Sequence, residues 1–187
     1  MLLLASLSPR RKELISRLGI PFTVLPADVN EEGITGYSPE ETVRILSKMK
    51  AQAIAKDHPD DIVLGADTVV AIDGQILGKP RDDAHAKEML RMLGGRSHQV
   101  FSGFTICQGA RCISRVAVCD VTFAPLSREE IDWYINSGEP FDKAGAYGIQ
   151  GLGGLFVTSI TGDYNAVVGL PLQQVYRTLK EEFGVSL

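Results

Sequence analysis

The stretch MLLLASLSPRRKELISRLG, residues 1–19, decides the class of fold. Residues 1–6 form a continuous apolar run that then stops, which is typical of a short buried strand in a parallel sheet. A helix is predicted to follow, with Ser8 as its N-cap, Pro9 at its first position and Gly19 at its C-terminal end. A buried strand that leads directly into a capped helix indicates an α/β fold.

The rest of the chain continues this alternation and adds hairpins. The predicted elements are a strand at 21–26, a helix within 37–59, a strand and hairpin at 61–77, a helix within 82–95, antiparallel strands at 98–107 and 110–124, a helix within 127–138, a strand pair at 155–160 and 165–170, and a helix at 171–183. We therefore expect one domain over residues 1–187, with a mixed, twisted sheet flanked by helices.

Composition excludes several classes of protein. Hydrophobic residues make up 44% and charged residues 22% of the chain, so it is neither disordered nor of low complexity. No apolar run reaches the roughly 18 residues of a membrane span, and the opening run lacks the preceding basic residues of a signal peptide. The net charge is −4, so the molecule as a whole does not attract nucleic acid. No membrane or nucleic-acid partner is expected.

The three cysteines, Cys107, Cys112 and Cys119, match no metal motif and form no CxxC pair. Free, buried thiols in a reducing compartment are the simplest interpretation. Together with the missing signal peptide, this predicts a cytoplasmic protein.

Basic residues stand where a helix normally disfavours them. Arg10, Arg11 and Lys12 occupy the first turn of the first predicted helix, whose unpaired N–H groups and partial positive charge suit an anion. A bound phosphate would explain this arrangement, and a solvated basic face on an ordinary helix is the alternative.

Carboxylates and lysines add to this basic cluster. Asp67, followed by Thr68, lies in the apolar strand VLGADTVV, where a carboxylate needs a partner, so it is a metal ligand, a general base or a structural cap. Lys50 lies on the apolar stripe of its helix, where it could also simply extend to solvent. Lys79 ends the arm of the hairpin that carries Asp67. Glu31 follows the second strand, either at a ligand crevice or in a solvated loop.

The glycine-rich segment FDKAGAYGIQGLGG, residues 141–154, matches neither the Walker A nor the dinucleotide-binding pattern. Its glycines surround Tyr147 and Gln150 and indicate backbone close to a ligand, or else a flexible surface loop. Asp142 and Lys143 could form a surface ion pair. The whole set of acidic and basic side chains fits attack of water on phosphorus, with a hard divalent cation such as Mg²⁺ or Mn²⁺ held by Glu31 and Asp67.

Six motifs in register resemble those of the Maf family of nucleoside triphosphate pyrophosphatases. They are LASLSPRRKEL, LGADTVV, LGKPRD, GGRSHQVFSG, FDKAGAYGIQGLGG and DYNAVVGLPL, and together they span residues 3–172. The resemblance implies two lobes around a cleft, a fold similar to that of inosine triphosphate pyrophosphatases, and commonly a homodimer. It also implies metal-dependent cleavage of a nucleoside triphosphate to a monophosphate and pyrophosphate.

The resemblance also assigns roles to residues. Asp67 falls where the family has its proton acceptor, and Glu31 and Asp67 would hold the metal. The positions that match substrate-binding or metal-binding positions of the family are Ser6, Arg10, Arg11, Glu31, Lys50, Lys79 and Gln150. Arg10, Thr68 and Gln150 together resemble the subgroup that acts on dTTP and UTP, with modified pyrimidine nucleotides as further candidates.

Three other functions remain open at this point. The sister subgroup of the family acts on 7-methyl-GTP. A nucleotide-binding regulator of septum formation in cell division would bind the same nucleotides without significant turnover. A nucleic-acid binder is disfavoured by the sequence pI of about 5.4.

Overall fold

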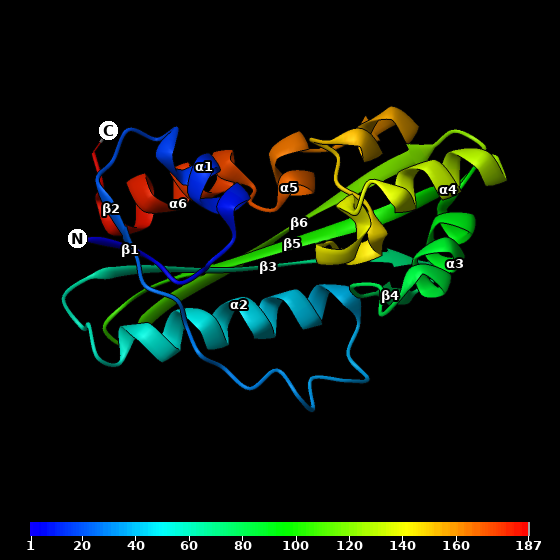
Figure 1. Ribbon diagram of the computed structural model, residues 1–187. Helices are drawn as coiled ribbons and strands as arrows, with labels where there is room; N and C mark the ends of the chain where they lie inside the picture. Colours follow the sequence, from blue (N-terminus) through cyan, green and yellow to red (C-terminus); the bar gives the residue numbers. More distant parts are fainter. Residues whose placement is uncertain (187) are drawn as a thin grey trace.

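Seven strands form one sheet with helices on both faces in the computed structural model, which describes residues 1–186 (Figure 1). The strands are β1 (Leu2–Leu4), β2 (Phe22–Val24), β3 (Ile62–Ile72), β4 (Gln75–Leu77), β5 (Ser97–Gln108), β6 (Arg111–Phe123) and β7 (Val157–Thr161). The helices are α1 (Pro9–Ser16), α2 (Pro39–Ala55), α3 (Asp83–Leu93), α4 (Arg128–Asn136), α5 (Tyr164–Val168) and α6 (Leu172–Phe183), with short 3₁₀ helices η1 (Glu139–Asp142), η2 (Ala144–Ala146) and η3 (Leu152–Phe156).

The sheet combines parallel and antiparallel pairing. Its strands follow the order β2-β1-β3-β5-β6-β7, and β4 pairs with β3. The strand β1 runs parallel to both β2 and β3, whereas the pairings of β4, β5, β6 and β7 are antiparallel. The predicted α/β fold with a mixed sheet flanked by helices is therefore confirmed.

One edge of β3 has a gap in its pairing. On that edge β1 pairs with Ile62–Leu64 and β4 pairs with Val70–Ile72, while the opposite edge pairs continuously with β5. Within the described chain, no strand pairs with residues 65–69 on the gapped edge. Asp67 and Thr68 lie in this gap. Ligands of open α/β sheets bind at such changes of strand connection.

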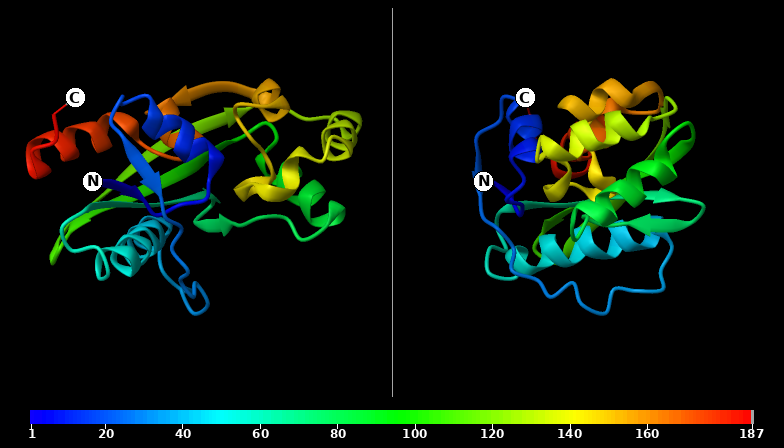
Figure 2. Two further views of the ribbon diagram at one scale, coloured as in Figure 1. Left: turned by 60° about the vertical axis from the view of Figure 1, so that its left-hand side comes forward. Right: turned by 45° about the vertical axis from the view of Figure 1, so that its right-hand side comes forward.

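The helices bury the two faces of the sheet separately (Figures 1 and 2). Leu2 and Leu4 point to the face covered by α1 and α6, and Leu3 points to the face covered by Ala51 and Ala55 of α2. This alternation is expected for a strand buried on both sides. In residues 1–186, no helix combines the length and the apolar character needed to cross a membrane.

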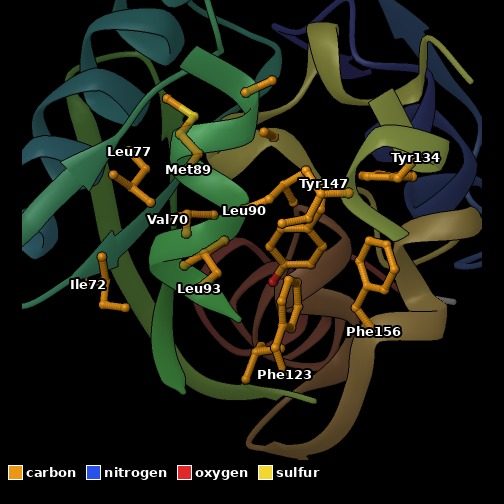
Figure 3. Close-up of a cluster of buried hydrophobic side chains, with 14 of the residues drawn as sticks. Val70, Ile72, Leu77, Met89, Leu90, Leu93, Phe123, Tyr134, Tyr147 and Phe156 are labelled. Carbon is orange, nitrogen blue, oxygen red and sulfur yellow. The ribbon is translucent and has the colours of Figure 1, made fainter. Parts of the chain in front are cut away.

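A second hydrophobic core lies at the far end of the long strands, beneath α3 and α4 (Figure 3). Leu90 and Leu93 of α3 pack there with Phe123 at the end of β6, and the rings of Phe123, Tyr147 and Phe156 meet edge to face. This core anchors the glycine-rich segment, because Tyr147 belongs to it. The segment is therefore attached to a packed interior and is not a free surface loop.

The helix α2 lies unusually close to the sheet because two strand residues lack a side chain. A Cβ atom at Gly65 would lie 2.6 Å from the backbone nitrogen of Ala51, and one at Gly103 would lie 2.7 Å from the carbonyl oxygen of Val43. Both distances are shorter than real Cβ contacts. The two glycines thus allow α2 to approach β3 and β5, and that approach brings its side chains to the middle of β3.

We expect Gly65→Ala to destabilise the fold by about 1–3 kcal/mol, because the new methyl group meets α2 backbone that cannot rotate away. Urea unfolding followed by circular dichroism would measure this loss. Gly78→Ala is the matched control, since a Cβ there has open space, and we expect it to cost less than about 0.5 kcal/mol. Equal stability of the two variants would show that close packing of α2 is not required.

Two local predictions are wrong. Residues 165–170 are not a strand: Tyr164–Val168 form the short helix α5, because the side chain of Asp163 accepts a hydrogen bond from the backbone N–H of Asn165 at 2.8 Å and caps it. The two valines favour a strand by propensity, but the cap and burial against the sheet override that preference.

The second correction concerns the cysteines. Cys107 and Cys112 form a disulfide between β5 and β6, whereas Cys119 is free and buried as predicted. The two bonded cysteines face each other directly in the antiparallel register, on either side of the hairpin turn. That register, which sequence spacing alone does not reveal, brings their sulfur atoms together.

Candidate active site

The predicted site residues surround one large cavity at the gap in the edge of β3. Its volume is about 1060 Å³. The predicted residues that line it are Ser6, Arg10, Arg11, Glu31, Lys50, Asp67, Thr68, Lys79 and Gln150. They come from the loops after β1, β2 and β4, from α1 and α2, from β3 and from the glycine-rich segment. The structure therefore brings all nine predicted positions together.

An ammonium group between two carboxylates forms the centre of the site. Lys50 Nζ lies 2.6 Å from Oδ1 of Asp67 and 2.8 Å from Oε1 of Glu31. The side chains of Lys50 and Asp67 are only 16% and 14% exposed, whereas Glu31 is 51% exposed. Lys50 reaches this point because α2 packs closely on β3. Its side chain is mostly buried, and its ammonium group meets both carboxylates in the cavity.

Two carboxylates that converge on one cation also fit a divalent metal ion. Mg²⁺ is commonly held by one or two carboxylates together with substrate phosphates and water, and Glu31 and Asp67 offer that number of hard oxygen ligands. No group of three or more His, Cys, Asp or Glu side chains within residues 1–186 could form a metal site by itself. A metal here would thus depend on the phosphates of a bound nucleotide for the rest of its ligands.

Arg11 connects three parts of the chain at the other face of the gap. Its Nε donates to the carbonyl oxygen of Gly169 at 2.9 Å, and its two terminal nitrogens donate to Oγ of Ser6 at 3.3 Å and Oγ1 of Thr68 at 3.1 Å. Burial lowers the pKa of Arg11 from its ordinary value, while Asp67 opposes that change and Arg10 adds to it. An arginine stays protonated in spite of this, so Arg11 contributes a fixed positive charge.

The N-terminus of α1 points basic and polar groups toward the cavity. Ser8 is the N-cap as predicted, accepts a hydrogen bond from the backbone N–H of Arg11 and is followed by Pro9. The first turn has no acidic residue, so its partial positive charge is not cancelled locally. Arg10 lies half-buried in this turn. The arrangement suits a phosphate, although α1 alone does not define a site.

Lys79 and Gln150 approach the cavity from two further segments. Lys79 follows β4 by two residues and lines the cavity on the side of the β3–β4 hairpin. Gln150 lies in the glycine-rich turn and is exposed. Within the described cavity wall it is the only side chain with a carboxamide, a group that both donates and accepts hydrogen bonds.

Several cavity residues were missed by sequence reasoning. Glu139 and Lys143 line the wall, and Gly169 supplies the carbonyl oxygen that Arg11 binds. Lys143 does pair with Asp142, at 2.6 Å, but its side chain is only 16% exposed, so this is not an ordinary surface ion pair. Density of glycine around 141–154 was the one signal that pointed to this wall. Nothing in the local pattern distinguishes Glu139 from other glutamates at helix ends.

A buried histidine forms a hydrogen bond with the hydroxyl of Tyr147. His98 Nε2 lies 2.8 Å from the hydroxyl of Tyr147, and the two rings meet edge to face. Desolvation lowers the pKa of His98 to about 4 and raises the pKa of Tyr147. Both groups are therefore neutral near pH 7. His98 therefore fixes one residue of the cavity wall.

Known proteins resemble the chain along its whole length. A family model described as "Maf-like protein" matches residues 1–182. A dTTP/UTP pyrophosphatase of Symbiobacterium thermophilum is 50% identical over 186 residues, covering 100% of this chain and 95% of that protein. Proteins of the same name from Bacillus mycoides and Bacillus velezensis are each 49% identical, covering 96% of this chain and 94% and 95% of theirs.

Solved structures resemble the chain in fold. A HAM1 protein from Coxiella burnetii has a TM-score of 0.56 at 19% identity, covering 96% of this chain and 98% of that one. The Ham1 protein of Staphylococcus aureus has a TM-score of 0.51 at 16% identity, covering 96% and 89%. At such low identity these matches show the shared α/β architecture and say nothing about substrate.

Proposed function

The chain belongs to the Maf family, and on that premise we propose that it hydrolyses dTTP and UTP between the α and β phosphates. The products are the nucleoside monophosphate and pyrophosphate. The observation that carries this proposal is the pairing of Lys50 with both Asp67 and Glu31 inside a cavity that Arg10 and Arg11 also line. Relatives about 50% identical over the whole chain bear the name dTTP/UTP pyrophosphatase.

In the proposed mechanism, Asp67 acts as the general base. Its Oδ1 is held by Lys50, and its second oxygen accepts a hydrogen bond from the water that attacks the α phosphorus. The proton passes from this water to the Asp67 carboxylate as the new O–P bond forms. The bond from the α phosphorus to the bridging oxygen breaks, and the electron pair leaves with pyrophosphate. Fixed geometry and charge supply most of the catalysis in such transfers.

Basic side chains stabilise the leaving group. Arg10, Arg11 and Lys79 line the same cavity, so they can contact the β and γ phosphate oxygens, where negative charge accumulates as pyrophosphate departs. Glu31 and Asp67 would hold the divalent cation, Mg²⁺ or Mn²⁺. When bound, that cation would neutralise phosphate oxygens and make the phosphorus a better target for water.

The base is proposed to lie beside Gln150. The combination of Arg10, Thr68 and Gln150 supports the pyrimidine subgroup rather than the one that acts on 7-methyl-GTP. A carboxamide suits the edge of a uracil or thymine ring, which carries an N–H donor between two carbonyl acceptors. Modified pyrimidine nucleotides with the same edge are further candidate substrates.

A nucleotide panel tests the proposal directly. We expect Mg²⁺- or Mn²⁺-dependent release of pyrophosphate from dTTP and UTP, abolished by EDTA, with much slower release from CTP, dATP, GTP and 7-methyl-GTP. Pyrophosphate and orthophosphate are measured separately, because orthophosphate would place the attack at the γ phosphorus and contradict the mechanism. Nucleotide binding without any turnover would instead support a regulatory protein.

Three other expectations stay predictions. The homodimer and the link to septum formation come from the family resemblance, whereas the cytoplasmic location comes from the residues of the sequence, the cysteines among them. The Cys107–Cys112 bond removes one support for the cytoplasmic location, since structural disulfides are rare in reducing compartments. Size-exclusion chromatography with light scattering would test the dimer.

A further inference from the structure

The carboxylate of Glu139 is held by donors from the protein. Its Oε1 accepts hydrogen bonds from the hydroxyl of Tyr134 at 2.8 Å and from the backbone N–H of Gly153 at 3.1 Å. Its Oε2 accepts one from the backbone N–H of Leu152 at 2.9 Å. Glu139 begins η1, whereas Leu152 and Gly153 begin η3. One side chain therefore ties η1, which lines the cavity, to η3, which directly follows the glycine-rich turn.

The backbone of the turn between these segments packs closely against the carboxylate of Glu139 and the hydroxyl of Tyr134. The backbone N–H of Gly148 donates to the hydroxyl of Tyr134 at 3.2 Å, so the turn is fixed at its start as well as at its end. A Cβ atom at Gly151 would lie 2.6 Å from Oε1 of Glu139, and one at Gly153 would lie 2.7 Å from the hydroxyl of Tyr134. Side chains at these positions would push the backbone away from the network.

Gln150 lies in the middle of this turn, between Gly148 and Gly151. Its side chain is exposed, and its position in the cavity therefore depends on the backbone that carries it. That backbone is held by Glu139 and by Tyr134, whose hydroxyl donates to Glu139. The network thus fixes the main chain on both sides of the only carboxamide in the described cavity wall.

Glu139 is poorly suited to contact the nucleotide itself. A carboxylate repels phosphate unless a cation lies between them, and both oxygens of Glu139 already receive hydrogen bonds from the protein. Desolvation disfavours its charged form, but the hydrogen bonds from Gly153, Leu152 and Tyr134 and the charge of Lys143 outweigh that effect and lower the pKa of Glu139. The group is therefore ionised at neutral pH and engaged with the turn.

We propose that Glu139 is a positioning residue for nucleotide selectivity, which holds the turn at 148–153 so that Gln150 meets the pyrimidine base. This inference rests on the proposed function. It assigns no chemical step to Glu139: the carboxylate acts only through the placement of Gln150. Base recognition would then depend on a side chain that does not touch the base.

The test is a double-mutant cycle of Glu139→Ala and Gln150→Ala, with KM and kcat measured for UTP and GTP. We expect each single variant to lower the preference for UTP over GTP about tenfold, through a higher KM for UTP, while kcat changes by less than about threefold. The double variant should be no worse than Gln150→Ala alone, because Glu139 acts through that residue.

Conservative variants show whether Glu139 acts by positioning the turn or only by keeping the protein folded. Glu139→Gln keeps an oxygen for Tyr134 and Gly153 but presents an NH₂ group to the Leu152 N–H, so we expect a loss smaller than that of Glu139→Ala. Tyr134→Phe removes the hydroxyl that joins Gly148 to Glu139 and should shift selectivity in the same direction. Glu129→Gln, an exposed glutamate in the first turn of α4, is the matched control and should change nothing.

Melting temperatures show whether each variant is folded. If Glu139→Ala does not fold, Glu139→Gln keeps the inference testable. If the losses of selectivity in the Glu139 and Gln150 single variants multiplied in the double variant, the inference would be overturned. An equal fall in kcat for every nucleotide would also overturn it.

Binding of α,β-imido-dUTP, measured by calorimetry, separates this inference from the proposed function. Wild-type protein that neither binds this analogue nor releases pyrophosphate refutes the proposed function, whereas an active wild type with unchanged selectivity in the variants refutes the role of Glu139 alone.

Discussion

Asp67→Asn is expected to lower the rate of pyrophosphate release from dTTP and UTP by about 10²- to 10⁴-fold. Asparagine has nearly the same shape as aspartate, but it cannot accept the proton of the attacking water. It also loses the charge that pairs with Lys50 at 2.6 Å. KM should change much less than kcat, because the general base acts in the chemical step rather than in binding.

The control is Asp73→Asn, a second aspartate of the same hairpin. Asp73 is exposed and pairs with Arg96 at 2.7 Å, and asparagine tolerates its positive φ of 51°. This variant should keep wild-type turnover. If Asp67→Asn remained folded, as judged by its melting temperature, and also kept near-wild-type kcat, Asp67 would not be the base.

Features that depend on neighbouring residues could be predicted from the sequence. Ser8 caps α1, and Ser38 with Glu41 forms the capping box of α2, because each of these caps joins residues only three positions apart. The apolar stripe of α2 correctly placed Lys50 on its buried side. The predicted hairpin at 61–77 forms from β3 and β4, and Lys79, at the end of its second arm, lines the same cavity as Asp67.

Features that depend on distant residues could not be predicted in this way. Arg11 binds a carbonyl oxygen 158 positions away, at Gly169, and no periodic pattern records such a contact. The same holds for the disulfide, which depends on the exact register of β5 and β6. The roles given to individual site residues came mainly from the family resemblance. The structure adds the atoms with which these residues form hydrogen bonds and ion pairs.

The gap along β3 explains how these residues gather. Successive side chains of a strand point to opposite faces, so Asp67 meets Lys50 of α2 on one face and Thr68 meets Arg11 of α1 on the other. A continuous sheet would keep the two faces apart. Because the edge of β3 is unpaired between β1 and β4, one cavity reaches both faces. A triphosphate bound there can contact groups from both sides.

Lys50→Met should lower kcat/KM for dTTP and UTP by about 10²- to 10³-fold. Methionine is close to lysine in length and is apolar, so we expect it to keep the packing of a side chain that is only 16% exposed. The charge is lost, however, and Glu31 and Asp67 then face each other and the incoming triphosphate without a cation between them. We expect both a lower kcat and a higher KM, unlike the Asp67→Asn result.

Lys48→Met separates the local effect from the change in total charge. Lys48 lies two residues away in the same helix and is exposed, and its replacement alters the net charge of the protein by the same amount. We expect it to keep nearly full activity. If both lysine variants lost activity equally, the loss would come from weaker long-range attraction of the nucleotide, which high salt would also remove in the wild type. A loss confined to Lys50→Met, and insensitive to salt, would place the ammonium group directly between the carboxylates and the substrate.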